Sequence, residues 1–236
     1  MKKNVQTLFL ILFILMIPSL LLAGNYQGLW VGQIELNNVN EAASKTNTDK
    51  LQPTKHVFDM TVLLHVDESG KVRLLKEVTM MQKAFSENGE DFSRRVLITN
   101  DSLLPNYEGI VRRDGKLTGI RLGSLAFDFE TNKNELELSG SFGAGNSLDG
   151  SIVMDENHPS NPFRHYYHPD HQQGKLITRN IQFTINSSQE SNNPDEAQFS
   201  LFGVYNETIS GLHKIPIKIN GLFSIQRVSE VGKLNE

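Results

Sequence analysis

The chain has 236 residues, a formal net charge of −4 at pH 7 and no cysteine. The absence of cysteine excludes an internal disulfide framework, a thiol nucleophile and thiolate metal ligands. The mildly acidic charge, with no basic patch interleaved with aromatic residues, argues against a nucleic-acid partner. Stability must therefore come from an apolar core, for which the length is sufficient.

The N-terminal residues have the pattern of a secretory signal peptide. Met1–Lys3 is a short basic start, Leu8–Leu22 is almost entirely apolar, and small residues follow at Ala23-Gly24. This run is shorter than the roughly 20 apolar residues of a membrane-spanning helix. An uncleaved anchor is the alternative. We expect cleavage near Ala23-Gly24, a secreted or periplasmic location, and a single domain over residues 24–236 with no transmembrane segment.

Apolar and polar residues alternate with period 2 after this leader, which predicts half-buried strands. The first strand covers residues 28–37. Residues 38–55 are polar and include Pro53, which predicts a long loop. The alternation over residues 58–66 and 72–78, on either side of a turn at 67–70, predicts a hairpin.

The middle and end of the chain continue the strand pattern. A polar link is expected at residues 85–92 and a polar loop at 187–196, while a D-G turn predicts a hairpin within 108–122. No stretch has a sustained 3.6-residue apolar period, so we expect little helix. The further strands are expected near residues 94–98, 125–129, 135–142, 148–154, 177–185, 198–208 and 215–228.

About ten short antiparallel strands in one domain predict a closed or partly open β-barrel, favoured slightly over a two-layer β-sandwich. Arg227 falls on the apolar face of the last strand, where it would lie over Trp30 as a cation–π partner if the first and last strands pair. This arrangement is similar to that of lipocalin-type barrels, in which a G-x-W motif on the first strand meets an arginine on a late strand. Only Gly28, Trp30 and Arg227 match, so we assign no family; the alternative is that Trp30 is simply a core aromatic.

Residues 155–171, DENHPSNPFRHYYHPDH, concentrate the unusual chemistry of the chain. Imidazole and carboxylate groups are suitable ligands for zinc or another transition metal, and carboxylate and amide oxygens of Asp155, Asn157 and Asp170 suit calcium. Pro162 and Pro169 break any helix, so the H-x-x-H-x-x-H spacing matches no hydrolytic zinc motif. The candidate metal ligands are His158, His165, His168, His171, Asp155 and Asp170.

The same stretch also has a structural interpretation. A proline-rich loop carrying Phe163, Tyr166 and Tyr167 can fold over an open end of the sheets. Its aromatic side chains would bury apolar area, and its histidines would form hydrogen bonds with backbone carbonyl groups. In this interpretation the loop is a cap, placed between the strands at 148–154 and 175–185.

Three functional hypotheses follow from these patterns. The leading one is a non-catalytic binding or structural domain with an envelope or extracellular partner, because no catalytic signature is recognisable. The second is a metal-binding protein or metal-dependent enzyme that uses His165, His168 and His171, with Glu156 or Asp170 as the base. The third is a barrel that carries an apolar small ligand in its interior.

Overall fold

The computed structural model describes residues 26–42, 48–107, 110–111, 117–129, 133–161, 175–190 and 199–236. The chain is all-β, as predicted. Eight strands belong to one large sheet: β1 (Gly28–Glu41), β2 (Thr48–Val66), β3 (Val72–Leu75), β9 (Glu135–Gly140), β10 (Ser147–Met154), β11 (Ile177–Glu190), β12 (Phe199–Ser210) and β13 (Ile217–Ser229). The other elements are β4 (Glu77–Glu87), β5 (Glu90–Ile98), the 3₁₀ helix η1 (Asp101–Asn106), β6 (Ile110–Val111), β7 (Leu117–Thr118) and β8 (Ile120–Gly123).

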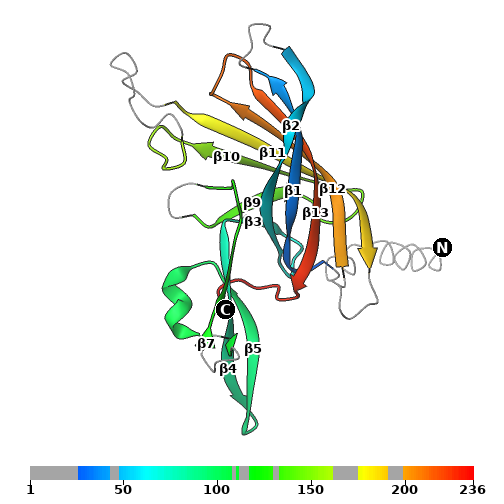
Figure 1. The fold of residues 1–236 in the computed structure, drawn as a ribbon. Coiled ribbons are helices and arrows are strands. Elements are labelled where there is room, and N and C mark those ends of the chain that lie inside the picture. The colour runs from blue at the N-terminus through cyan, green and yellow to red at the C-terminus, as the bar shows by residue number, and fades with distance from the viewer. Residues whose placement is uncertain are drawn as a thin grey trace, which may run out of the picture.

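The large sheet closes into a ring in the order β1-β13-β12-β11-β10-β9-β3-β2, with all pairs antiparallel (Figure 1). It is not a regular barrel, because β3 has only four residues and β9 joins β10 at only two positions. The first and last strands do pair, with Trp30 opposite Arg227, so the condition set for a contact between these two residues is met. The guanidinium of Arg227 lies 5.8 Å from the ring centroid of Phe199.

Aromatic side chains fill much of the ring interior. Successive residues of a strand point to opposite faces, so the period-2 pattern of the sequence places one set of side chains inside. Trp30, Phe183 and Tyr205 have no exposed surface. The ring centroids of Trp30 and Phe142 are 5.1 Å apart, and Phe183 lies 5.1 Å from Tyr205 and 5.5 Å from Phe223. Trp30 is therefore a core aromatic.

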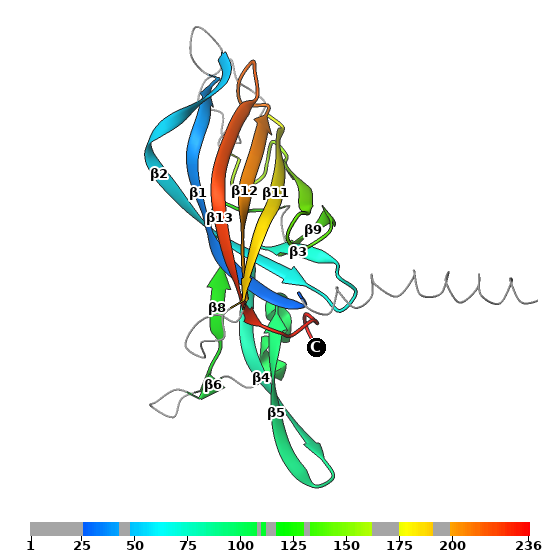
Figure 2. The same ribbon diagram turned by 90° about the vertical axis from the view of Figure 1, so that its right-hand side faces the viewer.

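A second, smaller sheet has the strand order β5-β4-β8 and projects from the ring (Figure 2). It begins where the chain leaves β3 and enters β4 after one residue, Lys76. Its inner end packs against the outer faces of β1 and β2, in a separate apolar cluster. The fully or nearly fully buried members of that cluster are Leu29, Leu63, Leu75, Val78 and Leu97.

The C-terminal tail, residues 230–236, holds the small sheet against the ring. Leu234 forms a parallel bridge with Leu97 of β5, and the Asn235 backbone amide donates to the Leu97 carbonyl at 2.7 Å. The Asn235 side chain accepts from the amides of Thr99 and Asn100 at 2.9 and 3.0 Å, and it donates to the Thr99 hydroxyl at 2.9 Å. The tail therefore completes the small sheet with specific polar contacts.

Three predicted connections are wrong. The expected loop at 38–55 is largely strand, because β1 runs to Glu41 and β2 begins at Thr48, with Asn38 opposite Pro53. The expected link at 85–92 is instead the end of a β4–β5 hairpin. β11 also continues to Glu190, so the expected loop at 187–196 is wrong for residues 187–190, while residues 191–196 lie outside the described part of the chain. In all three places the strands extend beyond the apolar core. Apolar and polar residues need not alternate there, because no face has to be buried in that core.

Residues 125–129 do not form a strand, although their apolar residues alternate as predicted. They cross one end of the ring with Phe127 and Phe129 almost fully buried. The Leu125 amide donates to the Thr61 carbonyl at 3.0 Å, which ties this segment to β2. The apolar period thus reflects burial against the end of a ring rather than membership of a sheet.

Candidate functional site

The histidine-rich stretch begins in the connection between β10 and β11, as predicted. Met154, the last residue of β10, pairs with Ile177, the first residue of β11. Residues 155–161 of this connection are described. His165, His168, Asp170 and His171 lie outside the described residues.

His158 is buried inside this connection, with only 3% of its surface exposed. One ring nitrogen, Nε2, forms a hydrogen bond with the Phe129 carbonyl, and the other, Nδ1, accepts from the Ser160 amide at 3.1 Å. Because Nδ1 acts as an acceptor, Nε2 carries the proton. Both ring nitrogens of His158 are therefore engaged with the backbone, which is the arrangement expected for a cap.

Asn161 closes the base of the same connection. It is 2% exposed, and its side-chain amide donates to the carbonyls of Asp155 and Lys175, both at 2.7 Å. Asp155 itself accepts from the Asn157 amide at 2.7 Å through Oδ1, which fixes a local turn. Buried polar groups are stable only when their hydrogen bonds are made, so these contacts fix the backbone of residues 155–161.

Asp128 joins the connection to residues 124–129. Its carboxylate pairs with Lys76 at 2.6 Å and accepts a hydrogen bond from the Ser160 hydroxyl. Burial alone would raise the pKa of Asp128, but the hydrogen bonds from Lys76 and Ser160 and the charge of Lys76 outweigh it and lower that pKa. Residues 124–129 and 155–161 together form what we call the ring cap.

A buried ion pair lies beneath the ring cap. Glu207 of β12 and Arg179 of β11 point inward, with side-chain exposures of 1% and 12%. The Arg179 guanidinium donates to both Glu207 carboxylate oxygens through Nε and Nη2 and to the Ala126 carbonyl at 2.5 Å. Its Cζ also lies 5.6 Å from the Phe127 ring centroid. The pair thus links two ring strands to the cap.

Tyr205 completes this group. Its hydroxyl donates to Glu207 Oε2 at 2.9 Å. Burial and then the negative charge of Glu207 raise the pKa of Tyr205 well above its usual value. Burial opposes the charge on Arg179, yet the hydrogen bonds and charge of Glu207 raise the pKa of Arg179 overall. The group is therefore a neutralised network of Arg179⁺, Glu207⁻ and neutral Tyr205.

The described residues contain no group of three or more His, Cys, Asp or Glu side chains placed to hold a metal ion. Asp155 is exposed and takes part in its local turn, while His158 is turned toward the backbone. The zinc or calcium site that would use His165, His168, His171 and Asp170 stays a prediction.

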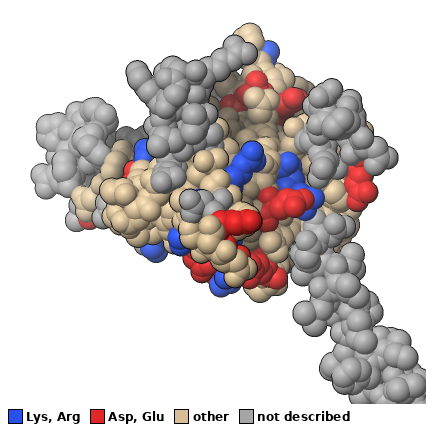
Figure 3. All heavy atoms as spheres, turned by 90° about the horizontal axis from the view of Figure 1, so that it is seen from below, with Lys and Arg blue, Asp and Glu red and all other residues tan. Residues whose placement is uncertain are grey.

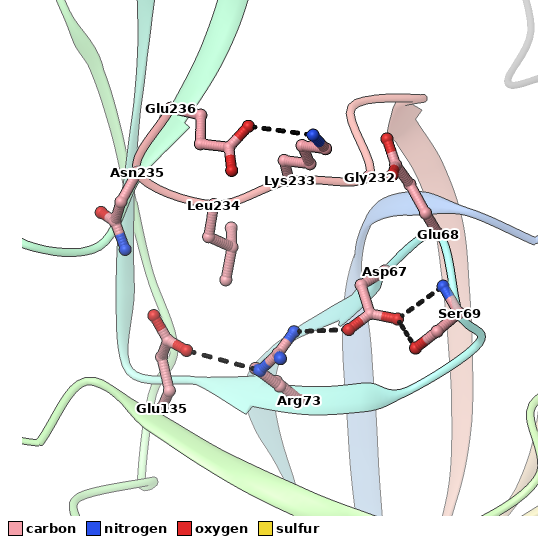
Figure 4. Close-up of a pocket in the computed structure, with 10 residues that line it drawn as sticks. All are labelled: Asp67, Glu68, Ser69, Arg73, Glu135, Gly232, Lys233, Leu234, Asn235 and Glu236. Atoms are coloured by element: carbon pink, nitrogen blue, oxygen red, sulfur yellow. Dashed lines mark hydrogen bonds and ion pairs between the residues drawn. The ribbon is translucent and has the colours of Figure 1, made fainter.

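A charged cleft of about 400 Å³ lies outside the ring, between the β2–β3 turn and the C-terminal tail (Figure 4). Its walls come from segments that are far apart in the sequence, so no local motif marks it. The lining residues are Asp67, Glu68, Ser69, Arg73, Glu135, Gly232, Lys233, Leu234, Asn235 and Glu236.

The floor of the cleft is an ion-pair network around Arg73. Its guanidinium lies 3.1 Å from Asp67 Oδ2 and 3.6 Å from Glu135 Oε2. Asp67 Oδ1 also accepts from the Ser69 and Lys71 amides at 2.9 and 3.0 Å. Burial alone would raise the pKa of Asp67, but a hydrogen bond from the Ser69 hydroxyl at 2.6 Å, those from the two amides and the charge of Arg73 together lower that pKa. Asp67 is therefore firmly ionised at neutral pH.

The rim of the cleft has unequal charge. Lys233 pairs with Glu236 at 3.2 Å, whereas exposed Glu68 has no hydrogen-bond or ion-pair partner in the part of the chain that the structure describes. Four carboxylates, those of Asp67, Glu68, Glu135 and Glu236, therefore line the cleft against two cations, Arg73 and Lys233.

His65 lies close behind this cleft, on the outer face of β2. The C-terminal tail covers the side chain and leaves it no exposed area. Nε2 forms a hydrogen bond with the Val231 carbonyl at 3.0 Å, while Nδ1 is buried and has no hydrogen-bond partner among the described residues. Burial is the main cause of a lowered pKa, so His65 is neutral at pH 7.

No protein-family model and no curated protein matches this chain. The candidate site is therefore interpreted from its own geometry and charge.

Proposed function

We propose that this protein is a secreted or periplasmic, non-catalytic binding domain. The ring is a packed scaffold, and the charged cleft receives a ligand that carries an ammonium or guanidinium group. The observation that carries this proposal is the excess of carboxylates around the cleft, where Glu68 at the rim has no ion-pair partner within the described part of the chain. A cleft of about 400 Å³ is within the usual size for a small ligand or an inserted side chain.

The packed ring interior supports a scaffold rather than a carrier of an apolar ligand. Large side chains that would line a ligand cavity instead contact one another, as Phe183 does with Tyr205 and Phe223. The ring cap with its buried Arg179–Glu207 pair occupies one end. Binding on loops and turns at the outside of a rigid sheet is the common arrangement.

The arrangement of the carboxylates supports an organic cation over a metal ion. A calcium site needs six to eight oxygen ligands around one point. Here Asp67 and Glu135 are occupied by Arg73, and Glu236 by Lys233. The negative charge is therefore distributed around the cleft and does not converge on one point. This distribution suits a ligand whose own positive charge is spread over a larger group.

The location rests on the signal-peptide pattern of residues 1–23. Among the described residues, no helix has the length and apolar character needed to cross a membrane. Intact-mass analysis of protein exported by a bacterial host tests the leader, because cleavage near Ala23-Gly24 would remove residues 1–23. Retention of the full mass in the exported fraction would contradict it.

Calorimetric titration with spermidine and with tetralysine tests the cleft. Removing one exposed charge changes the attraction by about 1 kcal/mol at contact distance, or roughly fivefold in affinity. We expect Glu68→Gln to weaken binding and Lys233→Gln to strengthen it, with both effects reduced at about 0.15 M salt. Glu41→Gln, an exposed acid at the far end of β1, is the matched control and should change nothing.

Two results would reject the proposed ligand class. One is the absence of binding for both cations at low salt. The other is a change in the same direction for Glu68→Gln and Lys233→Gln, because a charge field around the cleft must respond with opposite signs.

A further inference from the structure

One face of the β4–β5 hairpin carries three cross-strand pairs in sequence. Lys83 lies opposite Arg94, Phe85 opposite Phe92, and Glu87 opposite Glu90. From the ring outward, the face therefore has a basic row, an aromatic row and an acidic row. We call these six residues the arm face.

The arm face continues a buried face of the same hairpin. Closer to the ring, Met81 and Val96 are buried under Leu103, Leu104 and Tyr107 of the η1 region. This cover ends at Lys83, whose ammonium lies 5.9 Å from the Tyr107 ring centroid. β8 pairs with β4 only as far as Met80, so beyond this point the hairpin is a two-stranded ribbon (Figure 2).

The aromatic row is exposed although its two rings stack on each other. Phe85 and Phe92 stack with their ring centroids 5.6 Å apart and 25° between their planes. Their exposures are 40% and 43%. Stacking supports the ribbon by up to about 1 kcal/mol, but it leaves the outward faces of both rings in water.

The charged rows are unfavourable within one chain. Like charges directly opposite each other on an antiparallel pair are destabilising. None of the four charged side chains of the arm face has an ion-pair partner within the described residues. The end of the molecule toward which the arm points also presents acidic and basic groups side by side (Figure 3).

We propose that the arm face is a homodimer interface, with a second copy of this chain as its partner. A two-fold axis that runs across the strands at the phenylalanine row reverses the order of the rows in the partner. The basic row of each copy then lies over the acidic row of the other, and the aromatic rows stack. A two-fold interface must be self-complementary. The order of the basic, aromatic and acidic rows meets this requirement.

The same order disfavours insertion of the tip into a membrane. Glu87 and Glu90 lie beyond the phenylalanines, so an acidic row would meet an anionic lipid surface first. The face is also small compared with the roughly 1,200 Å² of stable interfaces, so the dimer is weak and reversible. The charged cleft lies outside the arm, so dimer formation and ligand binding in the cleft are independent of each other.

Sedimentation velocity over a range of protein concentrations tests the dimer through a charge exchange. Variant one, Lys83→Glu with Arg94→Glu, has an entirely acidic arm face around the aromatic row. Variant two, Glu87→Lys with Glu90→Lys, has an entirely basic one. We expect each to self-associate at least about tenfold more weakly than the natural chain, and their equimolar mixture to regain association. Arg95→Glu, on the opposite face of the ribbon, is the control and should leave association unchanged.

Circular dichroism and melting curves check that the variants fold, and the recovery on mixing excludes misfolding as the cause of lost association. A natural chain that stays monomeric at its highest soluble concentration would overturn the proposal. So would variants that associate as strongly as the natural chain, or a mixture that does not regain association.

Discussion

The ring and the small sheet are built from similar alternating strands, but they are stabilised differently. Every ring strand has a neighbour on both sides, and its inward side chains share one large core. The small sheet has edge strands on both sides and a smaller cluster against the ring. Its position depends on the tail, above all on Asn235. Closure distributes stability over many contacts, whereas the small sheet concentrates it in a few.

The largest expected effect concerns the buried ion pair of the ring interior, Arg179 with Glu207. Arg179→Met removes the cation and leaves Glu207 charged and buried beneath the cap. Breaking a buried pair in this way costs about 3–5 kcal/mol of unfolding free energy. We expect denaturant unfolding to show a loss of this size in the transition of the ring.

The paired replacement separates charge from packing. Arg179→Met together with Glu207→Leu removes both charges, so it should regain most of the lost stability, although Tyr205 loses its acceptor. Arg121→Met is the exposed comparison, because Arg121 pairs with Glu77 and Asp101 at the surface and should contribute less than about 1 kcal/mol. Equal losses for Arg179→Met and Arg121→Met would mean that the ring does not depend on its buried pair.

A smaller and more local effect is expected for the small sheet. Asn235→Ala removes one acceptor and one donor at the junction of the tail with Thr99 and Asn100, and its left-handed backbone (φ 65°) disfavours alanine. We expect a loss of about 1–3 kcal/mol confined to this region. Hydrogen exchange should quicken in β5 and the tail, while β12 keeps its protection.

Asn235→Asp is the matched control, because it retains the acceptor for both backbone amides and loses only the bond to the Thr99 hydroxyl. It should have the smaller effect. If β12 exchanged faster to the same degree as β5 in Asn235→Ala, the two regions would form one cooperative unit and the contrast between them would be wrong.

The sequence predicts the ring strands well because their alternation records burial on one face. β10, β12 and β13 lie within two residues of their predicted bounds. It fails at 38–55 and 85–92, where the strands extend past the core and both faces are polar or exposed. The tip at 85–92 still carried a usable signal, since Asn88-Gly89 has positive φ at both residues, as hairpin turns require.

The candidate site is less accessible to sequence reasoning. A proline-rich loop could be interpreted as a cap, and His158 bonds a backbone carbonyl as that interpretation expects. Arg179 and Glu207 each resemble a solvated strand residue when taken alone. Only the β11–β12 register, which places Ile181 opposite Glu207, brings them together. The cleft combines residues from 67 to 236, and this combination depends on ring closure.

The smallest expected effect concerns the tail that joins the two regions, through the titration of His65. Burial lowers the pKa of His65 below its usual 6.5, and Arg73 lowers it further, while the Val231 carbonyl, Asp67 and Glu135 oppose this. The unfolded chain therefore binds a proton that the folded chain excludes once the pH falls below about 6.5. The contribution of His65 to stability is complete above that pH and decreases as the pH falls toward the folded pKa, by at most about 1.4 kcal/mol per pH unit.

His65→Gln isolates this titration from that of the other histidines, because glutamine can still donate to the Val231 carbonyl but does not ionise. The difference in unfolding free energy between the natural chain and His65→Gln should be constant above pH 7. Between pH 6.5 and 5 the natural chain should lose stability relative to His65→Gln. Tail exchange should quicken over the same range in the natural chain alone. A difference that is independent of pH would mean that the folded chain accommodates protonated His65 without displacing the tail, because Asp67 or Glu135 stabilises the charge.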